Sequence, residues 1–380
     1  MNTTRLNLFL ILLTTLPGPL WGQSYIFSGQ AIGWAGMNIY EPVQFLTGIR
    51  YIPQLTFSDS VGHTYTLDAE ISFHARGSAT LAESQAGTTG SLKPYRAWLR
   101  FSGNRFELRA GLQKVNFGSA TILRPLMWFD RMDPRDPLQL TDGVYALLGR
   151  YYFLNNANIW IWGLYGNHDT KGWEYYPTLK GTVEFGGRGQ VPVPGGEMAL
   201  SWHHRTADPS QILPDTLNTA TRIPENRLAI DGRFDIGPGL WFEGVLIHRK
   251  PEQPIPEFRQ FLNTGIDYTF TVGNGLHLSG EMLLAGEGER PFDRQQGVLF
   301  GGITASYPIG LLHQIQAMVF YDFNGKQTYR FVNWSVTTDR WTGYFMGFWN
   351  PEQYRLFNLE TGENALFNGA GFQVMLVYNH

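Results

Sequence analysis

The residues that could take part in catalysis are few and poorly placed for it. His277, Ser279 and Glu281 occupy alternate positions, so on a strand they would share one face. Alternate residues of a strand lie about 6.8 Å apart, which is longer than a direct hydrogen bond between a nucleophile and its base. No Gly-x-Ser-x-Gly turn accompanies them. The sequence therefore predicts no catalytic residues and no enzyme.

Candidate ligands for metals and phosphates are equally weak. His203 and His204 are neighbours, and neighbours on a strand point to opposite faces, so they cannot easily share a metal. The aspartates of residues 133–142 lack the spacing of a calcium loop. The glycine-rich segment 186–189 lacks the strand–loop–helix context of a phosphate site. We predict neither a metal nor a cofactor.

The composition excludes several classes of partner. The formal net charge is −3 and no long run of Lys or Arg occurs, so nothing favours nucleic acid as a partner. The chain has no Cys, which excludes disulfides, thiolate metal sites and a lipidated Cys.

The first residues have the order of a secretory signal. Arg5 precedes the apolar segment 8–13, and prolines and small residues follow before Gln23. The apolar segment is too short for an uncleaved anchor, because a membrane-spanning helix needs about 20 apolar residues. We predict a signal peptide over residues 1–22. No later apolar run is long enough for a spanning helix, and residues 23–380 are predicted to form one domain.

Apolar and polar residues alternate with a period of two in many segments. In residues 64–74 every odd position is apolar and every even position is polar. The same pattern recurs in residues 227–235, 263–272 and 372–379. Side chains of a strand alternate between its two faces, so each segment has one apolar and one polar face. The pattern predicts antiparallel β-structure.

Three features favour a membrane barrel over a soluble sandwich. The strands often reach about ten residues, whereas soluble strands usually have five or six. Aromatic residues lie near the expected strand ends, where they would form interfacial girdles. Short turns alternate with longer connections along the chain, as in outer-membrane barrels. These aromatic residues are Tyr151, Tyr152, Trp160, Trp162, Trp202, Trp241, Trp334, Trp341, Tyr344 and Trp349.

The alternation of connections also predicts the number of strands. Eight short turns separate nine longer connections, which include residues 77–92, 114–142 and 167–177. This arrangement predicts a single closed antiparallel transmembrane β-barrel of about 18 strands, with 16 as the alternative. An even number of strands places both chain ends on the periplasmic side.

Residues 112–152 resemble the strand-to-loop segment of Gram-negative outer-membrane porins. In those barrels an Asn-Trp-Gly step precedes a loop that carries Asn-Pro-x-Asp. Here Asn116-Phe117-Gly118 and Asp133-Pro134-Arg135-Asp136 occupy the two places, with Phe for Trp and Asp for Asn. The resemblance implies a porin-type barrel in which this loop, the third external one, folds inward and narrows the pore.

The loop of residues 114–142 carries opposed charges that would line such a constriction. Charges of both signs across a narrow pore order water and select polar solutes. In the alternative interpretation these charges pair with one another and pin the loop to the rim. The candidate constriction residues are Arg124, Asp130, Arg131, Asp133, Arg135 and Asp136.

A second set of charges is predicted to face the lumen. Tyr95, Leu99 and Phe101 are predicted to face lipid, which turns the intervening residues inward. Arg or Lys on the lipid face near the bilayer midplane would cost about 2–4 kcal/mol. The candidate pore-lining residues are Asp68, Glu70, Arg96, Arg100, Glu107 and Arg109. Whether they line an open channel or fill the barrel stays open.

The leading hypothesis is therefore an exported channel in the outer membrane of a Gram-negative cell, for passive diffusion of small polar solutes. Its expected partners are outer-membrane lipid and these solutes. The sequence leaves the oligomeric state open, although many porins that it resembles are trimers. The alternative is a plugged structural or surface-binding barrel, with the aromatic loop residues Trp173, Tyr175, Tyr176, Tyr354 and Phe357 as a glycan-binding cue. A soluble secreted β-protein would be excluded if extraction required detergent.

Overall fold

The computed structural model describes most of the chain. The described residues are 24–40, 43–82, 85–132, 135–210, 222–250, 255–293, 297–351 and 367–380. The predicted signal peptide, Asp133, Tyr354 and Phe357 lie outside these ranges.

The described residues form 18 strands. Their bounds are β1 Ser24–Asn38, β2 Gln44–Val61, β3 Tyr65–Ala82, β4 Gln85–Ser102, β5 Phe106–Gln113, β6 Val144–Tyr152, β7 Asn158–Leu164, β8 Glu184–Val193, β9 Gly196–Ala207, β10 Ile223–Asp235, β11 Gly239–Arg249, β12 Phe258–Phe270, β13 Leu276–Gly288, β14 Val298–Ile309, β15 His313–Asp322, β16 Gln327–Thr337, β17 Trp341–Trp349 and β18 Ala370–Asn379. In the same ranges no helix is long and apolar enough to cross a membrane.

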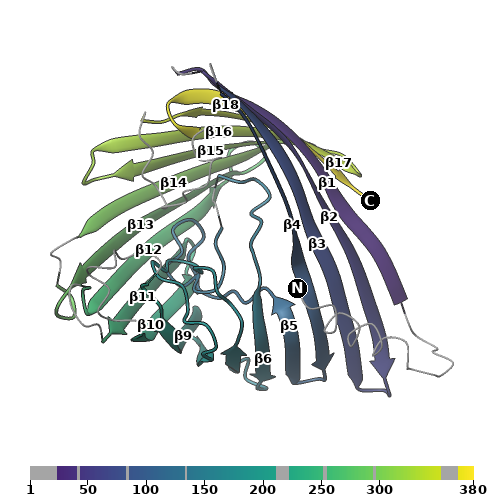
Figure 1. Ribbon diagram of the computed structural model, residues 1–380. Coiled ribbons are helices and arrows are strands. Elements are labelled where there is room, and N and C mark those ends of the chain that lie inside the picture. Colours follow the sequence, from purple (N-terminus) through teal and green to yellow (C-terminus); the bar gives the residue numbers. More distant parts are fainter. Residues whose placement is uncertain are drawn as a thin grey trace.

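The strands close into one antiparallel barrel (Figure 1). Each strand pairs with the next along the chain, and β18 pairs with β1, with Ile32 opposite Val377. The predicted closed barrel of 18 strands is confirmed. The start of β1 and the C-terminus lie at the same end of the barrel, because the backbones of Gly29 and His380 exchange two hydrogen bonds of 3.1 Å.

The period-two pattern places apolar side chains on the outer surface. On β12, Leu262, Ile266 and Tyr268 are about half exposed, whereas Asn263 between them is buried. The same contrast runs around the barrel, so the exterior is largely apolar. A closed barrel satisfies the backbone groups of every strand and can present such a surface to lipid.

One predicted long connection is wrong. Residues 77–92 belong mostly to β3 and β4, which pair along this whole segment, from Gly77 opposite Gly90 to Ala82 opposite Gln85. The hydroxyl groups of Ser78 and Thr89 are 2.8 Å apart across the pair. Small polar residues on both faces hide the alternation in this segment, but its backbone groups still pair.

The predicted orientation of Tyr95 is also wrong. The register of β3 and β4 shifts here, with Ser72 opposite Arg96 but Phe73 opposite Pro94. Tyr95 is the extra residue of a bulge, and its ring contacts His74 and the guanidinium of Arg96. Two successive side chains therefore point into the barrel, as bulges allow.

Several aromatic residues assigned to the girdles lie inside instead. Trp202, Trp334, Trp341 and Trp349 are exposed on the outer surface. By contrast, Trp162 and Trp241 are 2% and 3% exposed. Trp160 packs against the same buried cluster as Trp162, and Tyr344 packs against Trp34 and Met375. Position near a strand end did not identify the face, which alternation along each strand decides outside bulges.

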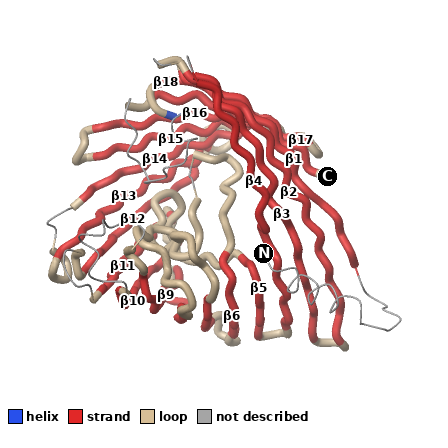
Figure 2. Tube along the Cα trace, viewed as in Figure 1, coloured by secondary structure: helices blue, strands red, loops and turns tan. Residues whose placement is uncertain are grey.

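Two connections fold into the barrel (Figure 2). We call residues 114–143, between β5 and β6, the first inner loop, and residues 165–183, between β7 and β8, the second inner loop. The first inner loop contributes apolar side chains, among them Phe117, Leu123 and Trp128, to a buried cluster with inward residues of β6–β17. The interior of this part of the barrel is packed with side chains.

Candidate functional site

The inner wall formed by β2–β6 carries partly exposed charges. Arg100 lies directly opposite Asp68 on the neighbouring strand, and its Nε and Nη2 atoms donate to Asp68 Oδ2 at 3.0 and 2.9 Å. The side chain of Arg100 is 33% exposed. Because its apolar neighbours Leu99 and Phe101 face outward, Arg100 presents its charge to the lumen.

The same wall continues on β5 and β6. Arg109 Nη2 lies 2.8 Å from Glu107 Oε1, which also lies 3.6 Å from Arg150 Nη1. The guanidinium of Arg109 lies over the ring of Trp98, and that of Arg150 lies over Trp160. Flat guanidinium groups stack well on aromatic rings and keep donors free for other partners.

Glu70 and Arg96 also face inward but are covered differently. Ser72 Oγ lies 3.5 Å from a carboxylate oxygen of Glu70. Arg96 is 8% exposed, and its Nη2 atom donates to the carbonyl oxygen of Thr141 at 2.9 Å. The first inner loop therefore covers Arg96, whereas Arg100 stays accessible.

The charged residues of the first inner loop have different surroundings. Arg124 donates to Asn116 Oδ1 at 2.7 Å, and Arg131 donates to Thr170 of the second inner loop at 2.7 Å. Asp136 Oδ2 lies 3.9 Å from Arg50 Nη1 on β2. Asp130 and Arg135 are each 1% exposed. Asp130 and Arg135 thus do not present their charges to water, while Arg131 and Asp136 remain partly accessible.

Asp130 is an unusual carboxyl group. Burial raises the pKa of Asp130 to about 7, although Lys114 and Arg96 act in the opposite direction. Within the described ranges neither of its oxygen atoms has a hydrogen-bond partner. A buried carboxyl group without donors favours its neutral form.

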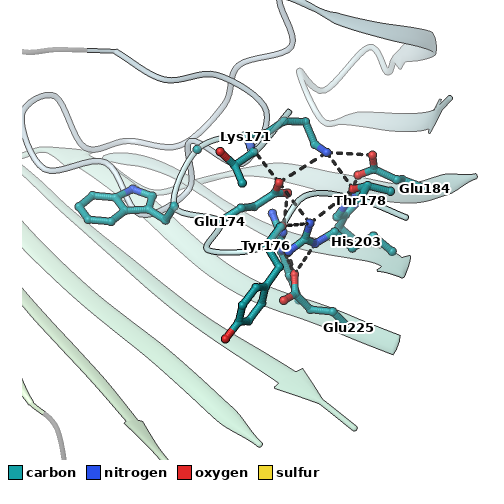
Figure 3. Close-up of polar contacts among 12 residues, drawn as sticks. Lys171, Glu174, Tyr176, Thr178, Glu184, His203 and Glu225 are labelled. Carbon is teal, nitrogen blue, oxygen red and sulfur yellow. Dashed lines mark hydrogen bonds and ion pairs between the residues drawn. The ribbon is translucent and has the colours of Figure 1, made fainter. Parts of the chain in front are cut away.

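The wall of β8–β11 is instead sealed by ion pairs with the second inner loop (Figure 3). Glu225 on β10 accepts hydrogen bonds from Arg205, Arg227 and Arg249, at 2.6, 2.7 and 2.9 Å. Glu174 of the loop lies 3.2 Å from Arg205 Nη1 and accepts from Arg227 at 2.7 Å. All five side chains are buried, so the wall around Glu225 is closed to solvent.

A second group of contacts continues this seal. Lys171 Nζ lies 2.9 Å from Glu184 Oε1 and donates to Thr178 at 3.0 Å. His203 Nε2 lies 3.2 Å from the other oxygen of Glu184, and its Nδ1 accepts from Trp162. Nothing in the sequence pattern predicted that this loop enters the barrel. A Lys and a Glu in a polar connection look like ordinary exposed loop residues. A single sequence does not show that they pair with buried charges on nearby strands.

The first inner loop is fixed to the wall by two carboxylates that the sequence analysis did not assign to it. Glu281 on β13 accepts from the backbone amides of Thr121, Ile122 and Leu123, at 2.6, 3.0 and 2.5 Å. Glu243 on β11 accepts from the amides of Ala120 and Leu126, at 2.7 and 3.0 Å. These contacts cross the barrel interior between segments far apart in the sequence.

The candidates for catalysis and metal binding have ordinary surroundings. His277 Nδ1 lies 3.0 Å from the hydroxyl of Thr269, and Glu281 is occupied by the loop. His203 is buried inside, whereas His204 contacts Phe185 and Trp202 on the outer face. Among the described residues no group of three or more His, Asp or Glu could hold a metal ion.

No protein-family model matches this sequence, and no curated protein sequence matches it. The structure is similar to OccAB4 of Acinetobacter baumannii, with 8% identity over 96% of this chain and 100% of that one and a TM-score of 0.56. It is also similar to OccD3 of Pseudomonas aeruginosa, with 9% identity over 95% and 92% of the two chains and a TM-score of 0.54. OmpT, an outer membrane protein of Vibrio cholerae, has 9% identity over 95% and 100%, with a TM-score of 0.53. The chain therefore has the fold of an outer-membrane β-barrel.

Proposed function

We propose that this protein is an outer-membrane channel of porin type for the passive diffusion of small polar solutes. One observation carries the proposal: the charges of Asp68, Arg100 and Arg109 on β3–β5 remain partly exposed inside the barrel, while the second inner loop covers the buried charges that surround Glu225 on β9–β11. A solute path would therefore run along the wall that carries Asp68, Arg100 and Arg109. We also place the protein in the outer membrane of a Gram-negative cell, because its fold is that of an outer-membrane β-barrel.

The constriction is assigned to the accessible charges of the first inner loop and the wall opposite it. Asp136 lies 3.9 Å from Arg50, so the loop places a partly accessible carboxylate beside a basic residue of the wall. Opposed charges in a narrow pore select polar solutes over apolar ones. The resemblance of Asn116-Phe117-Gly118 to the porin loop step supports this role, since Asn116 binds Arg124 and Gly118 has a positive φ of 102°.

The test is conductance of the purified protein in planar lipid bilayers. We expect discrete steps of ion current, partly blocked by sugars or organic anions that enter the channel. The control is a heat-unfolded sample of the protein added to the bilayer under the same conditions. An intact barrel that never conducts would overturn the proposal and favour the plugged surface-binding alternative.

The contacts made by the aromatic loop residues weaken the glycan-binding alternative. Trp173 donates from Nε1 to the carbonyl oxygen of Arg124, and the guanidinium of Arg259 lies 3.8 Å from the centre of the Tyr175 ring. Trp173 packs against the buried cluster inside the barrel, whereas Tyr175 is 39% exposed beside Arg259. We assign the protein no enzymatic activity, and an esterase activity abolished by Ser279→Ala would contradict this.

The outer surface of the barrel bears on the oligomeric state. The exterior carries a largely apolar surface that suits lipid or a second copy of the chain. OmpT, which shares the fold, has a described trimer form. Cross-linking in native membranes would distinguish a monomer from an oligomer.

A further inference from the structure

We propose that Glu243 and Glu281 are positioning residues that set the bore of the channel, because they hold residues 119–126 of the first inner loop against the wall of β11–β13. This inference rests on the proposed function. It adds that the position of the loop is determined by two wall carboxylates, and not by the charged residues of the loop itself.

Glu281 is the centre of the attachment. Besides three backbone amides, its Oε1 atom accepts from the hydroxyl of Thr121 at 3.1 Å and from Trp241 Nε1 at 3.1 Å. Its Oε2 atom accepts from Asn263 Nδ2 at 3.2 Å. Asn263 Nδ2 also donates to the carbonyl oxygen of Leu123 at 2.7 Å, so wall and loop are joined through both amide and carbonyl groups.

Glu243 extends the attachment to both sides of this centre. Its two oxygen atoms accept from Ala120 and from Leu126, which are six positions apart in the loop. Together the two carboxylates receive five backbone amides between residues 120 and 126. Carboxyl oxygen atoms accept hydrogen bonds, so these convergent N–H groups match both side chains without any cation.

The ion pairs between this loop and the β2–β4 wall are weaker. Asp136 lies 3.9 Å from Arg50, and the Lys93–Asp142 pair is largely exposed, with side chains 45% and 68% accessible. Exposed ion pairs contribute little, whereas buried hydrogen bonds to a charged group contribute substantially. The first inner loop also bonds to the wall through Thr141 to Arg96, at 2.9 Å, and through Ser119 to Asp231, at 3.3 Å, but each of these contacts involves one loop residue. The two carboxylates therefore form the most extensive polar attachment of residues 119–126 to the wall.

This attachment decides how much of the lumen stays open. Residues 120–126 pack against the β11–β13 wall, and the same loop later reaches Arg96 and Lys93 on β4 through Thr141 and Asp142. A loop that leaves the β11–β13 wall must move into the space beside β2–β6. The path for solute then fluctuates in width.

The first experiment compares Glu281→Gln and Glu243→Gln with wild type by single-channel recording. Glutamine keeps the size of the side chain but replaces one acceptor oxygen by an N–H₂ group that opposes the loop amides. We expect the fraction of time spent in altered conductance levels to rise about tenfold or more in Glu281→Gln, as for loss of hydrogen bonds to a charged group. Glu243→Gln, with fewer bonds, gives a smaller rise.

The matched control is Asp267→Asn. Asp267 is another inward carboxylate, on β12, but its partner is Arg233 at 3.0 Å and it does not touch the loop. The Asp267→Asn substitution removes one carboxylate from the barrel interior, as each Gln variant does. Steady conductance in Asp267→Asn and fluctuating conductance in Glu281→Gln support positioning. Equal fluctuation in both variants, or none in Glu281→Gln, overturns the inference.

A disulfide supplies a test that does not depend on the Gln variants. The chain has no Cys, and a Cβ built on Gly302 of β14 lies 3.4 Å from Ile122 Cγ2, so Ile122→Cys with Gly302→Cys can tether the loop to the wall. The same Cβ lies 3.1 Å from the ring of Phe320, which must shift by a few tenths of an ångström, so the reduced pair is the reference for the oxidised one. Oxidation should leave the conductance of the otherwise wild-type pair unchanged. It should restore steady conductance to the pair combined with Glu281→Gln, and reduction should remove the rescue.

The outcomes separate this inference from the proposed function. A wild-type protein that does not conduct refutes the channel itself. If wild type conducts but oxidation alters the pair in the wild-type background by more than about twofold, the loop does not rest where the carboxylates hold it. If the conductance still fluctuates in the oxidised pair combined with Glu281→Gln, the cause is the lost charge and not the position of the loop.

Discussion

Gly118 packs directly against the carboxylate of Glu243. A Cβ atom added at Gly118 would lie 2.5 Å from Glu243 Oε1 and 2.9 Å from the Cβ of Leu126, and the residue has a φ of 102°. Both the backbone conformation and the close approach therefore require glycine at the point where the first inner loop turns onto the wall.

We predict that Gly118→Ala destabilises this loop by about 1–3 kcal/mol, because strain and collision add. The strands do not depend on this position, so the barrel should still form. Mobility of the unheated protein on gels checks the barrel, and single-channel recording checks the loop. Gly347→Ala is the control, since a Cβ there meets nothing within 4 Å. Identical behaviour of the two variants would show that the loop does not need glycine at position 118.

Two charge changes on the β2–β6 wall are predicted to act in opposite directions. Arg100→Glu removes a positive charge that is partly exposed in the lumen, so selectivity should move toward cations. Asp68→Asn removes the partner carboxylate and should move selectivity toward anions. Reversal potentials in a salt gradient measure both, with Arg340→Glu in an exposed turn as the control. Unchanged reversal potentials would place the path elsewhere.

Glu225→Gln is predicted to destabilise the barrel strongly. Glu225 is 1% exposed and is the common partner of Arg205, Arg227 and Arg249. Removing its charge leaves buried guanidinium groups without full compensation, at a cost of about 3–5 kcal/mol. Thermal unfolding in detergent measures the loss. Glu197→Gln at the exposed end of β9 should have little effect, and a similar loss in both variants would contradict the special role of Glu225.

Asp130 is predicted to make stability depend on pH between about 4 and 7. Its pKa is 3.8 in ordinary surroundings and about 7 in the fold, so the folded chain keeps a proton that the unfolded chain releases. The free energy of unfolding therefore falls as pH rises through this interval, by at most about 1.4 kcal/mol per pH unit. Below and above this interval the contribution of this group to the free energy of unfolding no longer changes with pH.

The measurement is the denaturant midpoint in lipid vesicles from pH 4 to 8. Asp130→Asn mimics the neutral carboxyl group, so the variant should lose this part of the pH dependence. Its advantage over wild type should grow with rising pH and level off above about pH 7. An identical pH profile for the two proteins would show that Asp130 is not buried as described.

The sequence predicted the strands because alternation is a local property of the chain. A polar face and an apolar face follow from the period of two, so Asp68, Arg100, Glu107 and Arg109 could be placed inside before any contact was known. Alternation of short and long connections likewise predicted 18 strands. It failed at residues 77–92, where small polar residues on both faces conceal strands that extend β3 and β4.

The tertiary structure alone decided which charges stay accessible. Glu281 looked like one member of a strand face with Ser279 and His277, yet it receives the amides of residues 121–123 from across the barrel. Lys171 and Glu174 looked like parts of an external loop, yet they pair with charges on β8–β10. The physical reason is that pairing across a closed barrel depends on distance in space, and no periodicity within one strand encodes which distant carboxylate an inward loop will reach.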